Sequence, residues 1–194
     1  MPPLQDPDWV LIEKYFSGDL SAFHEIFSKH KKAAINLAFR VTGRRELAED
    51  IAQDVFIKVY EKKLKVCSTA KFSTWLYRVT LNASLDCVRR KSFFSFSLDE
   101  SKEPGETPPI ENLADPKAGL PSGKLDEAET GALVRKAIEH LPEKLRVPLL
   151  LFEYEERSYE EIAGILQTSV KAVERRIYHA RRELKGKLAK FFEY

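Results

Sequence analysis

Apolar residues recur every three or four positions along most of the chain, which is the spacing of one face of an α-helix. No alternating apolar and polar run has a useful length for a β-strand. In the first half the pattern predicts helices over 8–17, 20–42, 45–63 and 75–91, with a loop over 64–71. In the last third it predicts helices over 131–140 and 142–154 and a helix pair over 158–184. The sequence therefore predicts an all-α fold.

Turn and cap residues separate these helices. Gly18 and Gly43 follow the first two predicted helices, where glycine commonly ends a helix. Ser73 or Thr74 is placed to cap the helix over 75–91.

A segment of different composition separates the two helical blocks. Residues 96–130 contain five of the ten prolines and many carboxylates. Such a mixture buries too little apolar surface to offset the entropy of ordering. We therefore predict two helical domains, over 8–95 and 131–194, joined by a flexible acidic linker over 96–130.

Charge follows the same three parts. The formal net charge of +2 divides into +6 over residues 8–92, −6 over 93–130 and +3 over 131–194, with Asp6 supplying the remaining −1. Two basic blocks around an acidic connector indicate two modules that face a polyanion such as nucleic acid.

The bulk composition narrows the class of protein. With 43% hydrophobic and 32% charged residues, the chain has the composition of a soluble globular protein. No apolar run approaches the roughly 20 residues that a membrane-spanning helix needs, and residues 1–9 lack the features of a signal peptide. Cys67 and Cys87 have no partner at metal-ligand spacing. These features predict a cytoplasmic protein with no membrane insertion, disulfide scaffold, metal or cofactor.

The segment SYEEIAGILQTSVKAVERRIYHARREL, residues 158–184, predicts two short helices joined by a tight turn. Ser158 and Glu161 have the spacing of a capping box, and Ser169 is placed to cap the second helix. The predicted inward stripes are Ile162, Ala163, Ile165 and Leu166 in the first helix and Val170, Val173, Ile177, Ala180 and Leu184 in the second.

The second helix of this pair is strongly basic, since residues 171–190 contain eight Lys/Arg and two Glu. A solvated surface helix would show the same charge. A capped helix, a short turn and a capped basic helix together favour a helix that enters the DNA major groove.

A second candidate surface lies on the helix predicted over 45–63. Asp50, Gln53, Asp54 and Ile57 fall at positions i, i+3, i+4 and i+7, on the face opposite the apolar stripe. A solvated acidic face is one interpretation, and a carboxylate pair for metal-dependent hydrolysis is another, although no further ligand cluster accompanies the pair. An isoleucine within the polar stripe favours a third, a docking surface for a basic partner helix.

A third candidate surface lies in KFSTWLYRVTLNASLDCVRRK, residues 71–91, where basic residues are interleaved with aromatic ones. Single-stranded nucleic acid requires cations for its phosphates, rings that stack on bases and groups that read base edges. Trp75 also fits a purely core role, which explains the end from Asn82 to Lys91 less well.

Four segments in order resemble the extracytoplasmic-function sigma factors of bacterial RNA polymerase: AEDIAQDVF (48–56), FSTWLYRVTLNASLDCVRRK (72–91), LPEKLRVPLLL (141–151) and SYEEIAGIL (158–166). The resemblance implies a sigma region 2-like bundle, a region 4-like helix-turn-helix domain, and a transcription initiation factor that is not an enzyme. It implies as partners core RNA polymerase (the β′ coiled coil and the β flap), promoter DNA and an anti-sigma factor. The acidic linker would run through the active-site and RNA-exit channel, where its charge would mimic RNA.

The resemblance also assigns residues to three surfaces. The β′ coiled coil would be bound by Asp50, Gln53, Asp54, Phe56 and Ile57, although the helical pattern gives Phe56 to the core. The minus-10 element would be opened and bound by Lys65, Ser68, Thr69, Lys71, Trp75, Arg78, Asn82, Arg89 and Arg90. The minus-35 element would be read by Lys171, Glu174, Arg175, Arg176, Tyr178, His179, Arg181 and Arg182.

The recognition helix departs from the family pattern. Members commonly have Pro-Val-Gly-Thr-Val-Lys-Ser-Arg where this chain has SVKAVERR over 169–176. Glu174 stands where a basic residue is usual, and His179 stands where arginine is common. Glutamate accepts from cytosine N4 whereas arginine pairs with guanine, so we expect an atypical minus-35 sequence. An autonomous helix-turn-helix regulator is the alternative function, but it gives no reason for the pattern over 48–91.

Overall fold

The computed structural model describes residues 6–61, 70–98 and 125–192, with side chains over 6–61, 70–90 and 130–189. These residues form eight α-helices and no β-strand, which confirms the predicted all-α fold. The chain divides into two compact units, residues 1–111 and 112–194.

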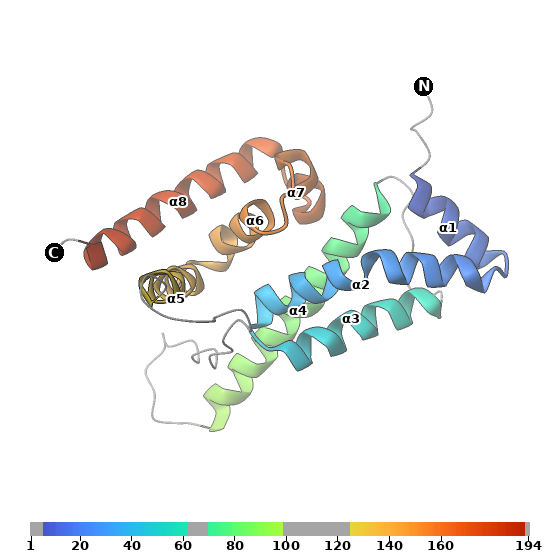
Figure 1. Ribbon diagram of the computed structural model, residues 1–194, viewed down its shortest axis with the longest axis horizontal. Helices are drawn as coiled ribbons and strands as arrows, with labels where there is room; N and C mark the ends of the chain where they lie inside the picture. The colour runs from blue at the N-terminus through green and yellow to red at the C-terminus, as the bar shows by residue number, and fades with distance from the viewer. Residues whose placement is uncertain (1–5, 62–69, 99–124, 193–194) are drawn as a thin grey trace. The chain divides into compact units, whose positions relative to one another are not determined.

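The first unit contains helices α1 (Pro7–Phe16), α2 (Leu20–Thr42), α3 (Arg45–Tyr60) and α4 (Phe72–Leu98). Helix α2 packs against the other three, and α4 also packs against α1 and α3 (Figure 1). Gly18 (φ 111°) and Gly43 (φ 69°) have the left-handed backbone that glycine adopts at a helix end, as predicted.

The apolar core of this unit draws on all four helices. Its largest fully buried side chains come from every helix of the unit, so each helix contributes to the core. They are Ile12 of α1, Ile26 and Leu37 of α2, Val55 and Val59 of α3, and Phe72 and Leu76 of α4. Burying such side chains contributes about 1.5–3 kcal/mol each.

The start of α4 differs from the prediction. The helix begins at Phe72, so Ser73 and Thr74 lie inside its first turn and do not cap it. The Phe72 N–H donates instead to Oδ2 of Asp6, 66 positions earlier in the chain, at 2.6 Å. No local sequence pattern predicts a cap that comes from so far away.

The second unit contains helices α5 (Leu125–Glu139), α6 (Glu143–Glu153), α7 (Tyr159–Leu166) and α8 (Val170–Phe192). Helix α8 packs against the other three, and α6 also packs against α7 (Figure 1). The core of the unit includes Leu149, Leu151, Ile162, Val173, Ile177 and Ala180, each no more than 2% exposed.

The predicted helix-turn-helix is confirmed at its caps. Ser158 and Glu161 form both hydrogen bonds of a capping box at the start of α7. Oγ of Ser169 accepts from the N–H of Ala172, 3.2 Å away, at the start of α8. The inward assignment of Val170 is wrong: it is the first residue of α8 and is 38% exposed.

Helix covers both ends of the predicted linker, because α4 continues to Leu98 and α5 begins at Leu125. Residues 99–124 lie outside the described residues, so the linker and the domain boundaries at 95 and 131 remain predictions. Within the described ranges, no helix is both long enough and apolar enough to cross a membrane.

Candidate functional site

The predicted docking face on α3 is exposed. Asp50, Gln53 and Asp54 are open to solvent, and Ile57 is 43% exposed despite its apolar side chain. Ala48, Ala52, Val55 and Val59, on the opposite side of the helix, are each no more than 2% exposed. Burial of that stripe fixes the rotation of α3 about its axis, and the rotation presents the polar stripe outward.

Phe56 does not belong to this face. Its side chain is 3% exposed, and its ring packs edge-to-face on Phe27 with 5.0 Å between ring centroids. The expectation that Phe56 contacts a partner is therefore corrected: Phe56 holds α3 against α2. The apolar pattern of the helix predicts this buried position.

The carboxylates of α3 do not belong to a metal-ligand cluster within the part of the chain that the structure describes. Among the residues that the structure describes, no group of three or more His, Cys, Asp or Glu side chains is placed to hold a metal ion. Asp50 and Asp54, one helical turn apart, remain as two carboxylates on an open convex surface. This geometry suits electrostatic contact with a cationic helix.

Helix α4 presents a polar face beyond its buried first turns. Asn82, Arg89 and Arg90 are exposed and Arg78 is partly buried. Arg78, Asn82 and Arg89 lie at i, i+4 and i+11 and so share a face. Asp86 lies on that same face, with Oδ1 3.7 Å from Nη1 of Arg89, and reduces its positive charge.

Trp75 is corrected from a base-stacking residue to a core residue. It is 3% exposed, and its ring centroid lies 5.5 Å from that of Phe72 and 6.3 Å from that of Trp9. Lys71 is exposed at the start of α4. Lys65, Ser68 and Thr69 lie outside the described residues.

Helix α8 has a narrow outward stripe. Lys171, Arg175, Tyr178 and Arg182 are exposed at i, i+4, i+7 and i+11, opposite the buried stripe of Val173, Ile177 and Ala180. Tyr178 is 62% exposed, the largest fraction among the exposed large hydrophobic side chains described. Glu174 and His179 are exposed on the flanks of the stripe, and Arg176 is partly buried. Three cations around one aromatic ring suit contact with a nucleic-acid groove.

Arg181 is occupied within its own unit. Its Nη2 and Nε atoms donate to Oε1 of Glu153 at 2.7 and 3.0 Å, and the guanidinium lies 5.1 Å from the centroid of the Phe152 ring. The side chain therefore joins α8 to the end of α6 while staying half-exposed, and its contact with the minus-35 element remains a prediction. Glu153 lies 28 positions earlier, so helical spacing alone does not predict the pair.

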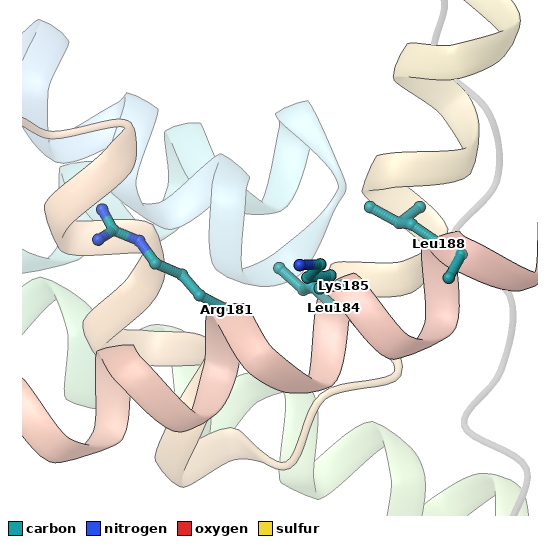
Figure 2. Close-up of a pocket in the computed structure, with 5 residues that line it drawn as sticks. Arg181, Leu184, Lys185 and Leu188 are labelled. Carbon is teal, nitrogen blue, oxygen red and sulfur yellow. The ribbon is translucent and has the colours of Figure 1, made fainter. Parts of the chain in front are cut away.

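A hollow on the C-terminal half of α8 is lined by Arg181, Leu184, Lys185, Leu188 and Ala189. Figure 2 shows four of these side chains projecting from the one helix. A small-molecule site usually gathers polar groups from several elements, so this hollow has the character of an open helix face.

Two residues at the start of α1 have a role outside the three surfaces that the sequence predicts. Asp6 caps α1 and also binds the Phe72 N–H, and Nε1 of Trp9 donates to the carbonyl of Ala70 at 2.6 Å. The signal that finds the first role is Asp6-Pro7, since Asp is a common N-cap and Pro suits the first helical position. The contacts with Ala70 and Phe72 have no local signal.

Comparisons with known proteins agree with this division. The Sigma-70 region 2 family matches residues 26–94, within α2 to α4 of the first unit, and the Sigma-70 region 4 family matches residues 132–184 of the second. The RNA polymerase sigma-H factor of Pseudomonas aeruginosa is 32% identical over 181 residues, which cover 91% of each chain. The ECF RNA polymerase sigma factor SigW of Bacillus subtilis is 32% identical over 178 residues, 91% of this chain and 94% of SigW.

Solved structures share the fold. The sigma factor RpoE, in complex with the anti-sigma factor NepR from Bartonella quintana, covers 88% of this chain and 98% of its own, with a TM-score of 0.65 and 21% identity. CnrH, in complex with the cytosolic domain of CnrY, covers 95% and 99% with a TM-score of 0.64 and 24% identity. Both sigma regions are present in order, and relatives match over nearly the whole chain. The chain therefore belongs to the extracytoplasmic-function sigma factors of bacterial RNA polymerase, which direct transcription initiation at specific promoters.

Proposed function

We propose that this sigma factor acts through three separate surfaces: the α3 stripe binds core polymerase, the α4 face binds the minus-10 element, and the α8 stripe reads the minus-35 element. The observation that carries the proposal is the α3 stripe, where Asp50, Gln53, Asp54 and Ile57 are all exposed beside a fully buried apolar face. A basic partner helix, as in the β′ coiled coil, complements this combination of two carboxylates and one apolar contact.

On the minus-10 side, the chemistry is binding of an unstacked base. Asn82 supplies an amide that hydrogen-bonds a base edge, and Arg78, Arg89 and Arg90 supply cations for the phosphates. Opening a base step costs a few kcal/mol, which the new contacts offset without any covalent step. We therefore infer a specificity subunit with no reaction of its own, acting in the cytoplasm where core polymerase is found.

On the minus-35 side, Lys171, Arg175 and Arg182 are placed to contact phosphates or guanine, with Tyr178 between them. The N-terminal turns of a recognition helix reach the base edges, so Lys171, Glu174 and Arg175 are the strongest candidates for reading sequence. Glu174 would accept a hydrogen bond from cytosine N4. Arg176 and His179 flank the groove contact, and the β flap of the polymerase is the remaining partner proposed for this unit.

Regulation by an anti-sigma factor is part of the proposal. Among solved structures that share this fold, RpoE is in complex with the anti-sigma factor NepR, and CnrH is in complex with the cytosolic domain of CnrY. A partner that covers the α3 stripe and the α8 stripe would prevent both polymerase and DNA binding. The acidic segment within 96–130 is proposed to occupy the RNA path in the polymerase, since its net charge has the sign of RNA.

The test is transcription by core polymerase mixed with the full-length chain on a randomised promoter library. The proposal predicts productive initiation from a limited set of two-element promoters. An autonomous regulator would instead bind duplex DNA tightly without polymerase and give no productive complex. Tethered elements reinforce one another, so moving the two promoter elements apart should abolish initiation.

A further inference from the structure

We propose that Asp6 and Trp9 are positioning residues for the minus-10 surface: they fasten the N-terminal end of α1 to the N-terminal end of α4. The fastening sets where α4 presents Arg78 and Asn82. This inference rests on the function proposed for α4, and it assigns a part in promoter opening to residues that precede the region 2 match at 26–94.

The carboxylate of Asp6 binds two helices at once. Oδ1 accepts from the N–H of Asp8 in α1 at 3.3 Å, and Oδ2 accepts from the N–H of Phe72 in α4 at 2.6 Å. The first N–H groups of a helix have no partner within the helix, and the positive end of the helix dipole favours a carboxylate there. One side chain thus satisfies the starts of both helices.

Trp9 binds the backbone two residues before the start of α4. Its Nε1–H donates to the carbonyl of Ala70 at 2.6 Å, and its ring meets Phe72 edge-to-face, with centroids 5.3 Å apart. The Ala70 carbonyl and the Phe72 N–H, on either side of Lys71, are therefore both bound by α1 side chains. Trp9 is 7% exposed, so water competes little for its hydrogen bond.

Helix α1 is itself anchored, which makes it a firm support. Asp8 binds Lys29 and His30 of α2, and the His30 ring also packs on Phe72 with centroids 5.3 Å apart. Since α4 is continuous from Phe72 past Asn82, a shift at its first residue is transmitted along the helix. The docking stripe of α3 makes none of these contacts.

The experiment uses Asp6→Ser and Trp9→Phe in the full-length chain. Serine still caps α1, but its single oxygen does not span to Phe72. Phenylalanine keeps an aromatic ring beside Phe72 but has no N–H for Ala70. The readouts are thermal unfolding, affinity for core polymerase, and affinity of the assembled holoenzyme for a single-stranded minus-10 oligonucleotide.

We expect core affinity to stay within about twofold of wild type. Oligonucleotide affinity should fall about five- to tenfold, which corresponds to the loss of one hydrogen bond between α4 and the DNA. Asp6→Asn keeps one acceptor and should give an intermediate loss. Asn82→Ala is the positive control for the α4 surface. If Asn82→Ala weakens oligonucleotide binding but neither Asp6→Ser nor Trp9→Phe does, the positioning role is overturned while the minus-10 assignment of α4 stands.

Two other outcomes also overturn the inference. Parallel losses of core and oligonucleotide affinity, in proportion to lost stability, would make Asp6 and Trp9 ordinary stabilising residues. Full oligonucleotide affinity in Asn82→Ala would overturn the minus-10 assignment of α4, and the positioning role with it.

Discussion

Nε2 of His30 lies 2.8 Å from Oδ2 of Asp8, and both side chains are buried where α1 meets α2. Nζ of Lys29 binds the other oxygen of the same carboxylate. Burial alone would raise the pKa of the Asp8 carboxyl, but the hydrogen bonds from Lys29 and His30 outweigh it and hold the pKa below its ordinary value. This carboxylate therefore links helix packing to pH.

Asp8→Asn is expected to reduce the acid sensitivity of the first unit. A carboxyl whose folded-state pKa is lowered contributes stability above its ordinary pKa of 3.8 and loses it as pH falls through the folded value. The substitution should lower the free energy of unfolding at pH 7 by about 2 kcal/mol. It should also flatten the loss of stability that wild type shows as the pH falls below the ordinary carboxyl pKa of 3.8.

Urea unfolding of the full chain from pH 7 through this fall in pH measures both effects. Lys29→Met is the matched control: its ammonium is half-exposed, so its loss should cost less than about 1 kcal/mol at pH 7. If the Asp8→Asn variant is as sensitive to acid as wild type, Asp8 is not a source of that sensitivity.

Substitutions at the neighbouring residues Phe56 and Ile57 are expected to have different effects, one on stability and the other on polymerase binding. Phe56→Ala empties a core position against Phe27 and should cost about 3–5 kcal/mol of unfolding free energy. Ile57→Ala, at an exposed position, should cost less than about 1 kcal/mol but weaken core binding. Denaturant unfolding and a pull-down with core polymerase measure the two quantities. If Phe56→Ala keeps its stability but loses core binding, Phe56 is a contact residue of the docking face.

Arg181 and Arg182 are neighbours in sequence with different expected roles. Arg182→Ala should lower the slope of log affinity against log salt for a minus-35 duplex by about one phosphate contact. Arg181→Ala should leave that slope unchanged and lower stability by up to about 1 kcal/mol, because its guanidinium binds Glu153 at the surface. Fluorescence anisotropy at several salt concentrations compares them. Equal slopes for the two variants would contradict the internal role of Arg181.

Glu174 is expected to set one base of the minus-35 element. Glu174→Lys should replace a preference for cytosine at one position by a preference for guanine, with a discrimination of about 1–3 kcal/mol. Selection from a library randomised in the minus-35 element shows the change, and Glu183→Lys, further along the same helix, controls for added charge. An unchanged preference would mean that Glu174 does not face a base.

The sequence and the structure agree where the determinants are local. Helical periodicity, the capping box at Ser158 and the glycine at Gly43 each depend on neighbours within a few positions, and each is confirmed. The exposed stripe of α3 follows from the same periodicity. Individual residue roles within the polymerase complex are not fixed by periodicity and remain proposals.

The differences arise where a partner lies far along the chain. Asp6 caps α4 from 66 positions away, and Glu153 binds Arg181 across 28 positions. Tertiary packing chooses such partners, so a helical wheel drawn for one segment does not contain them. For Phe56 and Trp75, the position in the family pattern predicts contacts with polymerase and DNA respectively. Both side chains are instead buried in the core.

The affinity of Asp54→Arg for core polymerase tests the docking role of α3 most directly. Glu49→Arg is the matched control, because it makes the same charge change on α3 at an exposed position beside, and not within, the docking stripe. We predict that Asp54→Arg weakens core binding at least about a hundredfold, with the helical circular dichroism and unfolding midpoint unchanged, while Glu49→Arg binds like wild type. Wild-type binding by a folded Asp54→Arg variant would contradict the docking role of α3.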